Sequence, residues 1–506
     1  MVRMKRGLAP IGVLPIIMLA ATAFAWAGGQ SGSRSDQPIR LDPANPHYFL
    51  FRGKTIALVT SGEHYGAVIN RGVDYKRYLA TIAADGLNET RLFGGSYVEV
   101  PGKSFGIERN DLAPAPGDFI APWARSSAPG DAGGGNKFDL DRWNPEYFER
   151  LHDFLAEASR LGIVVEISLF SSQYGEAQWA LSPLNPANNI NHAELNDWKM
   201  INTRDNGGIL RYQESYTRKI VQAVSGFDNV IFEIENEPWS DRPVPSGLIN
   251  PYLIPPGRDQ FPNSIDTADP LSLEWQTAVA GWIASEEGSS PNKHLVAQCY
   301  SNFRLPLQSL IPGVSIVNFH YAYPEAVTWN YGLEKAIACD ETGFLGRDDA
   351  AYRRQAWNFI MSGGSIFDAL DYSFTPGHED GADTAPNGPG GGSPTLRQQL
   401  HILSGFLLSL PLGHMRPDPA TVVHASGAVA RGLSWPGQTY AFYLDGAGPA
   451  DLMLSLPAAH YAGQWIDVLT GNTVAREDLR TTGKVITLRS PAFADGIALR
   501  LDRTGP

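Results

Sequence analysis

Cysteine is nearly absent from this sequence: Cys299 and Cys339 are the only two among 506 residues. Two cysteines cannot form the disulfide framework that stabilises small secreted domains. Each lies inside an apolar, strand-like run, so we expect two buried thiols, with a single disulfide as the alternative. A chain of this length exceeds what one hydrophobic core usually sustains, and we therefore expect two domains.

Cations are also few. The chain has 40 lysine and arginine residues against 53 aspartate and glutamate residues, which gives a formal net charge of −13. Such acidity argues against nucleic acid or an anionic membrane surface as a partner, because both attract positive charge. A neutral substrate such as a glycan is compatible with it. The oligomeric state is left open.

The N-terminal apolar run, Leu8–Ala23, contains two prolines and is shorter than the roughly 20 residues that span a bilayer. It follows three cations and precedes an Ala-Trp-Ala pattern, which together predict a signal peptide over residues 1–27. No cysteine follows, so we expect no lipid anchor and a secreted protein, either periplasmic or extracellular. Residues 28–45 begin Gly/Ser-rich and are predicted to form a flexible tether.

Several motifs of other protein classes are missing. The sequence has no G-x-S-x-G elbow, which argues against a serine esterase on an α/β sheet. Its eleven histidines form no i, i+4 pair around a glutamate, and there is no cysteine cluster, so we predict no metal site and no cofactor. Ser61–Gly66, after the first expected barrel strand, lacks the G-x-G-x-x-G spacing of a dinucleotide-binding turn.

Apolar segments of strand length alternate with helical segments up to about residue 410. The expected strands are Lys54–Thr60, Gly86–Gly94, Ile163–Phe170, Ile231–Trp239, His294–Tyr300, Ser315–Tyr323, Lys335–Glu341 and Gly364–Tyr372. The expected helices are Asp74–Ala84, Pro145–Leu161, Leu210–Val224, Leu271–Glu287, Asp349–Ser362 and Leu396–Leu410. This alternation predicts a parallel α/β architecture, and eight repeats favour a closed (β/α)₈ TIM barrel over residues 46–411. A doubly wound open sheet is the alternative.

The sequence changes character after about Pro411. Short alternating runs follow one another, separated by turns such as Asp445-Gly446. This pattern predicts a small all-β sandwich domain over residues 412–506. Whether that domain binds glycan or braces the barrel is left open.

The stretch Ile231–Trp239 reads IFEIENEPW and ends its strand at Asn236-Glu237-Pro238. Pro238 supplies no backbone N–H and disfavours helix in the residue before it, so Glu237 is expected at the strand's C-terminal tip. Barrel enzymes carry their functional residues at such tips. The other candidates at predicted tips are His64, Asn88, Arg91, Asn236, His320, Tyr321, Tyr323, Asp340, Glu341 and Asp371. Glu237 and Glu341, on strands four and seven, form the carboxylate pair that glycoside hydrolysis requires.

With these residues in place, the chain resembles the clan A glycoside hydrolases, especially the cellulase-like family five. In that clan the Glu of Asn-Glu-Pro is the general acid/base, and the preceding Asn binds the sugar 2-hydroxyl. A Glu that ends strand seven and is followed shortly by Gly is the nucleophile. The resemblance implies these roles for Glu237, Asn236 and, in CDETGF, Glu341. It covers roughly Thr55–Phe374 and implies a retaining double displacement.

The resemblance extends to the residues around the pair. An Arg on strand two in an Asn-x-x-Arg setting hydrogen-bonds the nucleophile, which implies this role for Arg91. A His-aromatic segment on strand six matches His320 with either Tyr321 or Tyr323. The histidine that usually ends strand three in family five has no counterpart, and His64 from strand one is the candidate for that space.

Physical chemistry agrees with these roles. Arg91 beside Glu341 would hold the nucleophile ionised at a low pKa. Trp239 is a candidate platform for a sugar ring. Glu233 and Glu235 are expected to be structural, paired with cations inside or around the barrel.

The sequence therefore predicts a secreted, retaining glycoside hydrolase that acts on a poly- or oligosaccharide. A non-catalytic carbohydrate-binding protein on the same barrel is the alternative, although such a protein has no need of both carboxylates. The glycan, its linkage and the choice between internal and terminal cleavage depend on long loops that composition does not describe.

Overall fold

The computed structural model describes residues 37–249, 264–288, 290, 292–384 and 388–505. The predicted signal peptide and the first part of the predicted tether lie outside the described residues. No helix in the described part of the chain is long and apolar enough to cross a membrane.

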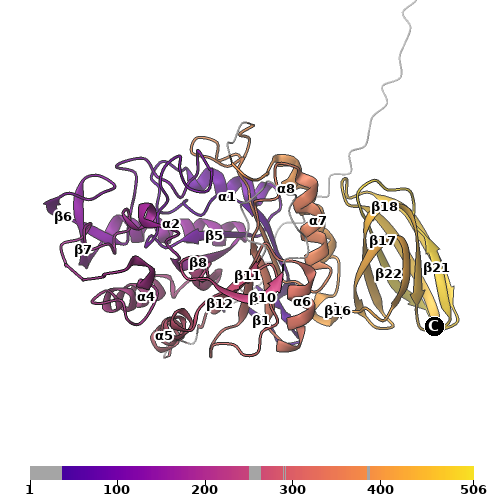
Figure 1. Ribbon diagram of the computed structural model, residues 1–506. Helices are drawn as coiled ribbons and strands as arrows, with labels where there is room; N and C mark the ends of the chain where they lie inside the picture. The colour runs from indigo at the N-terminus through magenta and orange to yellow at the C-terminus, as the bar shows by residue number, and fades with distance from the viewer. Residues whose placement is uncertain (1–36, 250–263, 289, 291, 385–387, 506) are drawn as a thin grey trace, which may run out of the picture. The chain divides into compact units, whose positions relative to one another are not determined.

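Eight parallel strands form the barrel that the sequence predicts (Figure 1). In order around the barrel they are β4 (Leu58–Gly62), β15 (Ile366–Leu370), β14 (Ala336–Glu341), β13 (Ile316–His320), β12 (Leu295–Asn302), β9 (Val230–Asn236), β8 (Val164–Ser171) and β5 (Glu89–Phe93). All of these strand residues are buried, as expected for parallel strands covered on both faces. The alternative of a doubly wound open sheet is wrong.

Asn88 joins the two edge strands, β4 and β5, and so closes the barrel. Its backbone N–H lies 3.4 Å from the carbonyl oxygen of Val59, and its side-chain oxygen accepts from the Val59 N–H at 2.8 Å. Its side-chain nitrogen donates to the carbonyl of Ala57 at 2.9 Å. Asn88 therefore precedes the N-terminal end of β5, and its expected position at a C-terminal tip is wrong. Its amide is used for strand pairing.

The outer layer contains α1 (Tyr75–Ala84), α2 (Pro145–Leu161), α4 (Leu210–Val224), α5 (Pro270–Glu286), α7 (Asp349–Ile360) and α8 (Pro394–Leu408). All six predicted helices are confirmed. Local signals explain α2: the Asn144 side chain caps its first turn, Pro145 begins it, and Gly162 ends it at a φ of 81°. The short helices α3 (Glu176–Trp179) and α6 (Pro324–Asn330) are not predicted, because neither is long enough to show a helical period.

Three short strands at the start of the described chain cover the N-terminal end of the barrel. They are β1 (Arg40–Asp42), β2 (Asn45–Phe51) and β3 (Lys54–Ile56), and they form an antiparallel sheet. Their apolar side chains form one cluster with the first inward residues of the barrel strands; the cluster includes Ile39, Phe49, Phe51, Ile56, Leu58, Val164, Ile231, Ile316 and Ile366. The prediction of a flexible tether is wrong for residues 40–45, because they join this sheet and Ile39 is fully buried.

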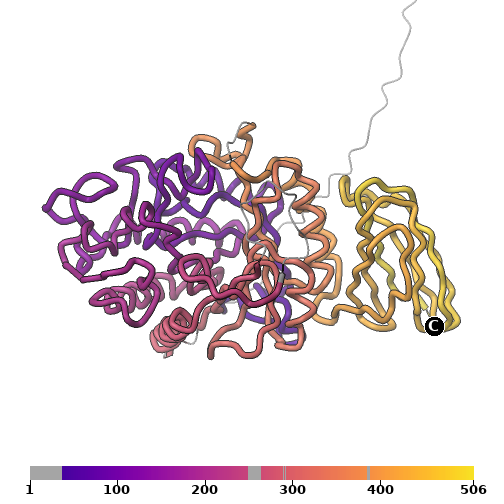
Figure 2. The backbone as a smooth tube through the Cα atoms, viewed as in Figure 1, coloured from indigo at the N-terminus to yellow at the C-terminus, as the bar shows by residue number. Residues whose placement is uncertain are grey.

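Two hairpins lie within connections at the C-terminal ends of the barrel strands. The first, β6 (Trp123–Pro129) with β7 (Asn136–Trp143), interrupts the segment between β5 and α2. The second pairs β10 (Val244–Ile249) with β11 (Ser264–Thr267) after β9, and β11 also pairs with β12. Figure 2 traces these connections in the purple and magenta parts of the backbone. Their polar, Pro/Gly-rich composition gives no strand period, so neither hairpin is predicted.

The C-terminal residues form the predicted antiparallel β-sandwich. Its strands are β16 (Arg416–Pro417), β17 (Val422–Trp435), β18 (Thr439–Ser455), β19 (Ala459–Asp467), β20 (Thr473–Thr481), β21 (Val485–Arg489) and β22 (Ile497–Gly505). The short alternating runs expected from the sequence, Val422–His424 with Val429–Leu433 and Gln438–Leu444 with Asp451–Leu456, merge in pairs into β17 and β18. The register shift between Ser426 and Ala428 lets β17 continue where its alternation breaks.

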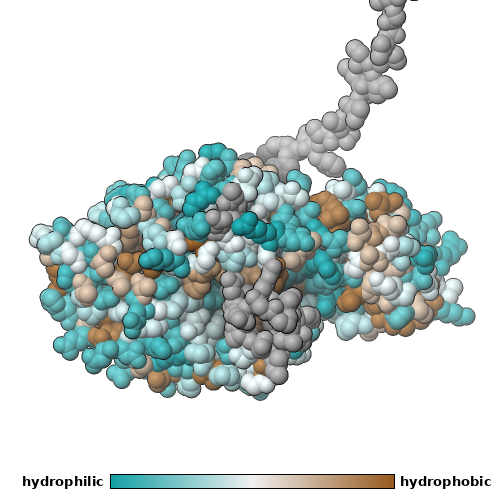
Figure 3. Space-filling view, turned by 45° about the horizontal axis from the view of Figure 1, so that its top comes forward, coloured by the Kyte–Doolittle hydropathy of each residue, from teal (hydrophilic) through white to brown (hydrophobic). Residues whose placement is uncertain are grey.

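The sandwich contacts the barrel through α7. Trp357 stacks on Tyr443 of β18 with ring centroids 5.2 Å apart, and Arg354 makes a 2.8 Å ion pair with Asp445. On the face drawn in Figure 3, hydrophobic side chains are interspersed with hydrophilic ones over the barrel, which is normal for a protein surface.

Candidate active site

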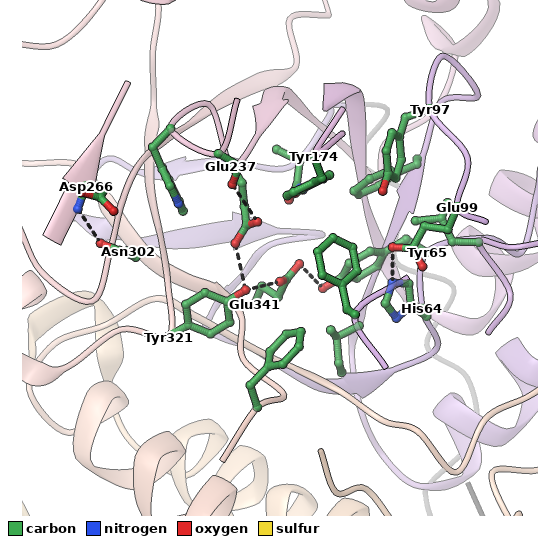
Figure 4. A pocket seen from close by; sticks show the side chains of 18 of the residues that line it. His64, Tyr65, Tyr97, Glu99, Tyr174, Glu237, Asp266, Asn302, Tyr321 and Glu341 are labelled. Carbon is green, nitrogen blue, oxygen red and sulfur yellow. Dashed lines mark hydrogen bonds and ion pairs between the residues drawn. The ribbon is translucent and has the colours of Figure 1, made fainter. Parts of the chain in front are cut away.

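The C-terminal ends of the barrel strands surround a pocket of about 410 Å³ (Figure 4). The pocket is lined by His64, Tyr65, Phe93, Tyr97, Glu99, Phe105, Leu112, Tyr174, Asn236, Glu237, Trp239, Ser240, Pro243, Asp266, Asn302, Tyr321, Glu341, Phe344 and Leu370. Glu237 and Glu341 both belong to this lining, so strands four and seven bring the predicted carboxylate pair into one cavity.

Glu237 lies immediately beyond β9, where the sequence predicts the strand to end. The strand stops at Asn236, and Glu237 has a φ of 47° in the left-handed region. Its Oε1 lies 2.9 Å from Nδ1 of His320 and 2.8 Å from the hydroxyl of Tyr321. Its Oε2 accepts from the hydroxyl of Ser240 at 3.3 Å. Neighbours on strand six therefore fix the direction of this carboxyl.

Glu341 is the last residue of β14 and receives three donors. The hydroxyl of Tyr65 lies 3.0 Å from Oε2, and Nη1 of Arg91 lies 3.2 Å from the same oxygen. The hydroxyl of Tyr321 lies 2.9 Å from Oε1. Hydrogen bonds that donate to a carboxylate favour its ionised form.

Burial by itself raises the pKa of Glu341, but the charge and hydrogen bonding of His320 and the charge of Arg91 outweigh it. The pKa of Glu341 falls to about 2. The expectation of an ionised carboxylate beside Arg91 agrees with this environment. At neutral pH the group carries a full negative charge while being only 6% exposed.

The two carboxylates lie close to each other. An oxygen of Glu237 and one of Glu341 lie within 4.8 Å, together with a ring nitrogen of His320. The hydroxyl of Tyr321 bridges them, since it lies within hydrogen-bonding distance of both. A ligand atom in the pocket can therefore be reached by both carboxyl groups.

His320 is fully buried and faces carboxylates on both sides of its ring. Burial lowers its pKa, but Cys299, Glu341 and Asp340 oppose burial and hold the pKa well above its usual range. Nδ1 faces Glu237, and Nε2 lies 3.5 Å from Oδ2 of Asp340. These acidic neighbours therefore favour the protonated form of the ring.

Arg91 occupies the barrel interior beneath the pocket. Its guanidinium bonds Glu341 and the side-chain oxygen of Asn236 at 2.7 Å, and it pairs with Glu233. The prediction that Glu233 pairs with a cation inside the barrel is confirmed. Glu235 is different: it accepts hydrogen bonds from Asn202, Ser272 and Gln276, which are neutral.

Asn236 is held at both ends of its amide. Its oxygen accepts from Arg91, and its nitrogen lies 2.6 Å from the hydroxyl of Tyr174 and 3.3 Å from Oγ of Ser171. These contacts fix the amide orientation at the edge of the pocket beside Glu237.

Backbone strain is concentrated around the pocket. Tyr65, Tyr174, Glu237 and Tyr321 have φ angles of 57°, 60°, 47° and 55°. Such conformations cost on the order of 1–3 kcal/mol each for residues other than glycine. Each strained residue directs its side chain toward the carboxylate pair or its immediate neighbours.

The other predicted site residues are placed as follows. His64 and Trp239 line the pocket, and Trp239 contacts the ring of His320 edge-on at 5.5 Å. Of the two tyrosines left open by the sequence, Tyr321 lies between the glutamates. Tyr323 stacks on Phe303 and is not among the residues that line this pocket. Asp371, another predicted tip residue, points away from the pocket and pairs with Arg397.

Sequence reasoning misses Tyr65, Tyr174 and Glu99. Tyr65 and Tyr174 follow strands one and three, where an aromatic residue after a polar run is the only signal available. Glu99 lies in the long connection after β5, and it contacts His64 at one end of the pocket. No local pattern marks that contact.

Two side-chain groups in the described part of the chain have the spacing of a metal site. One comprises Glu233, Cys299, His320 and Asp340, and the other Glu237, His320 and Glu341. Both depend on His320, and a protonated imidazole has no lone pair to offer a metal. Arg91 also occupies the first group by pairing with Glu233 and Asp340. Ion pairs link members of both groups.

The fold can be compared with known proteins. No protein-family profile matches the sequence, and no curated protein matches it either. Among solved structures, a candidate glycoside hydrolase from Bacteroides vulgatus ATCC 8482 matches with a TM-score of 0.63 at 14% identity, covering 94% of this chain and 84% of that one.

Two further structures match over nearly their whole length. One is described as a glycoside hydrolase, with a TM-score of 0.60 at 11% identity over 93% of this chain and 98% of that one. The other is a glycoside hydrolase of family 5 from Bacteroides vulgatus ATCC 8482, with a TM-score of 0.58 at 11% identity over 92% and 94%. The chain therefore shares its fold with glycoside hydrolases, those of family 5 among them.

Proposed function

We propose that this protein is a secreted glycoside hydrolase that cleaves O-glycosidic bonds of a poly- or oligosaccharide with retention of configuration. The observation that carries the proposal is that Glu237 and Glu341 face one pocket, with one oxygen of each carboxyl group within 4.8 Å of the other. Carboxyl groups about 5–5.5 Å apart are typical of retaining enzymes, whereas inverting enzymes need roughly 6.5–9.5 Å to admit a water molecule. The short separation supports the retaining reaction.

In the first step, Glu341 attacks the anomeric carbon and Glu237 gives its proton to the departing glycosidic oxygen. The carbon–oxygen bond to the leaving group breaks, and the sugar remains bound to Glu341 as an ester. The low pKa of Glu341, caused by His320 and Arg91 despite burial, keeps the attacking carboxylate ionised.

In the second step, Glu237 removes a proton from water, which attacks the same carbon and releases Glu341. Tyr321 touches both carboxyl groups and can pass its single hydrogen bond to whichever is charged. Asn236, whose amide is fixed by Arg91 and Tyr174, is placed to bind the 2-hydroxyl of the reacting sugar.

The test is hydrolysis of a panel of nitrophenyl glycosides and polysaccharides by the wild type and by Glu341→Gln. We expect wild-type turnover and a loss of at least about a thousandfold in kcat for the variant. Glu149→Gln, an exposed glutamate on α2, is the control and should match the wild type. Equal inactivity of wild type and Glu341→Gln over the whole panel, with glycan binding retained by both, would instead establish a carbohydrate-binding protein.

A further inference from the structure

One wall of the pocket is the loop from Tyr97 to Leu112, which follows β5. This loop packs against the connection between β4 and α1. Gly66 lies under this loop: a Cβ atom added there would lie 2.0 Å from the carbonyl carbon and oxygen of Asp111 and 2.4 Å from the nitrogen of Leu112. The two backbones therefore touch, and only glycine permits the approach. The side-chain nitrogen of Asn70 also donates to the Asp111 carbonyl at 2.9 Å.

The loop folds back on itself behind the pocket. The backbone N–H of Glu99 donates to the carbonyl of Leu112 at 2.9 Å, and Asn110 donates to the Glu99 carboxylate at 2.9 Å. Glu99, Leu112 and Tyr97 line the pocket, yet each is at most 2% exposed. Phe105, which belongs to the same loop and also lines the pocket, is exposed, so the closed part of the wall is the part formed by Tyr97, Glu99 and Leu112.

The side of the pocket next to Glu237 is different. Ser240 and Phe344 are half-buried there and Pro243 is exposed. Figure 4 shows Asp266 and Asn302 on this side of Glu341, with His64, Glu99 and Tyr97 on the other side. The pocket thus has a buried end beyond Tyr65 and a more exposed end beyond Glu237.

The two ends correspond to the two halves of a glycoside. The proton donor, Glu237, must meet the oxygen of the leaving group, while the nucleophile, Glu341, meets the anomeric carbon of the sugar that stays. The leaving group therefore extends toward the exposed end. The retained sugar lies between Glu341 and the buried wall, which leaves no path for a chain to continue.

The size of the cavity agrees with this division. Its volume of about 410 Å³ lies near the lower limit of ligand pockets, roughly 300–1,000 Å³, and suits a ligand of about the size of a disaccharide. One ring fits on each side of the scissile bond. A longer glycan must extend out of the exposed end.

The wall offers hydrogen bonds to hydroxyl groups. Each carboxylate oxygen of Glu99 accepts one protein donor, Nε2 of His64 at 3.2 Å or Asn110, and retains a second lone pair. The hydroxyl of Tyr97 makes no hydrogen bond to the described residues and is buried in the same wall. Free hydroxyls of a terminal sugar match these groups.

The charge of the wall selects against acidic sugars. The acidic lining residues are Glu99, Glu237, Asp266 and Glu341, and no lysine or arginine is among the described residues that line the cavity. His64 already pairs with Glu99, so a uronic acid or a sulfated sugar would find no lysine or arginine in this lining to pair with its charge.

We propose that the protein is an exo-acting enzyme that removes one uncharged sugar residue from the non-reducing end of its substrate, with Glu99 and His64 binding the hydroxyls of that residue. This proposal rests on the proposed glycosidase function.

The test uses neutral pentasaccharides labelled with a fluorophore at the reducing end, together with nitrophenyl glycosides of neutral sugars and of uronic acids. We expect release of a monosaccharide, with labelled tetrasaccharide as the first labelled product. Neutral glycosides should exceed the uronides by about tenfold or more in kcat/KM. Labelled di- or trisaccharide as the first product would overturn the exo-acting proposal and leave the glycosidase intact, whereas hydrolysis of no substrate would overturn both. Uronides cleaved as fast as neutral glycosides would overturn the charge selection.

Two variants test whether the wall formed by this loop is responsible for the removal of single sugar residues. Glu99→Gln should lower kcat/KM by about ten- to a hundredfold, mainly through KM, because the sugar hydroxyls lose a charged acceptor. Gly66→Ala should displace the loop and increase the share of internal cleavage products. Gly281→Ala is the matched control: a Cβ atom at this helical glycine meets nothing within 4 Å. An unchanged KM in Glu99→Gln, with an unchanged product pattern in Gly66→Ala, would contradict the role of this wall.

Discussion

The hydroxyl of Tyr321 lies 2.9 Å from Oε1 of Glu341, and the same hydroxyl reaches Oε1 of Glu237 at 2.8 Å. One proton cannot be donated to two ionised carboxylates at once. In the proposed reaction, the hydroxyl can donate to Glu341 before attack and to Glu237 once Glu341 has become the glycosyl ester.

Tyr321→Phe removes this bridge without changing the ring. We expect kcat/KM to fall by about ten- to a hundredfold, since a hydrogen bond to a charged group contributes roughly 1.5–3 kcal/mol. Loss of the donor also raises the pKa of Glu341 from about 2, so the acid limb of the pH profile should move to higher pH. The measurement is kcat/KM against pH for both proteins. A lower rate with an unmoved acid limb would contradict the bridge.

Arg91 has a structural role in addition to its contact with Glu341. It is fully buried and pairs with Glu233, which is also fully buried. Arg91→Met should destabilise the protein by about 3–5 kcal/mol, because Glu233 loses its partner in the barrel interior. Chemical denaturation measures this change.

The double variant Arg91→Met/Glu233→Gln is the control for that experiment. It removes both charges, so it should regain a large part of the lost stability while remaining inactive. Equal stability of the single and the double variant would show that the pair does not account for the destabilisation.

Because Asp368 is buried, we expect the free energy of unfolding to fall as the pH rises. Burial raises its pKa to about 8 against the opposing charge of Arg91, and neither carboxylate oxygen has a hydrogen-bond partner among the described residues. Between its unfolded pKa of 3.8 and about 8, the folded protein binds a proton that the unfolded chain releases. The free energy of unfolding should therefore fall with rising pH by up to about 1.4 kcal/mol per unit.

Asp368→Asn cannot titrate and should show a flatter dependence over the same window. Denaturation at about pH 5 and about pH 8 measures the difference between the two proteins. Asp141→Asn, at an exposed position, should retain the wild-type slope. Identical slopes for wild type and Asp368→Asn would contradict the burial of an uncompensated carboxyl group at this position.

The barrel is predictable from the sequence because its strands are buried on both faces and read as continuous apolar runs between helical segments. Glu237 is predictable for a local reason, since Pro238 forces the strand to end beside it. Strand β1 escapes prediction because its place depends on packing against distant parts of the chain: Ile39 is in a polar stretch, and only its contact with the barrel floor buries it.

The C-terminal end of β14, the seventh barrel strand, shows a second limit of prediction from sequence. Alternation along a strand predicts that Asp340 and Glu341 point to opposite faces. In the structure, Phe319 pairs with Cys339 and His320 with Glu341, so Asp340 is an extra residue in β14. This bulge turns both carboxylates toward Arg91. A register shift of this kind depends on the neighbouring strand, and the sequence of one strand alone does not reveal it.

The contact between His64 and Glu99 is likewise not predictable from the sequence. These residues are 35 positions apart, and they meet because Gly66 has no side chain to keep the loop away from its backbone. Neither residue belongs to a recognisable motif. Their pairing depends on the path of the loop after β5, which composition does not determine.

In the proposed reaction, Glu341 forms a covalent bond to the sugar while Glu237 transfers the proton. The most direct measurement is the anomeric configuration of the first product, followed by proton NMR during hydrolysis of a nitrophenyl glycoside by the wild type. A double displacement at this pair predicts a product with the configuration of the substrate, which later mutarotates. A first product of inverted configuration would contradict the account, because it would require water, and not Glu341, to attack the anomeric carbon.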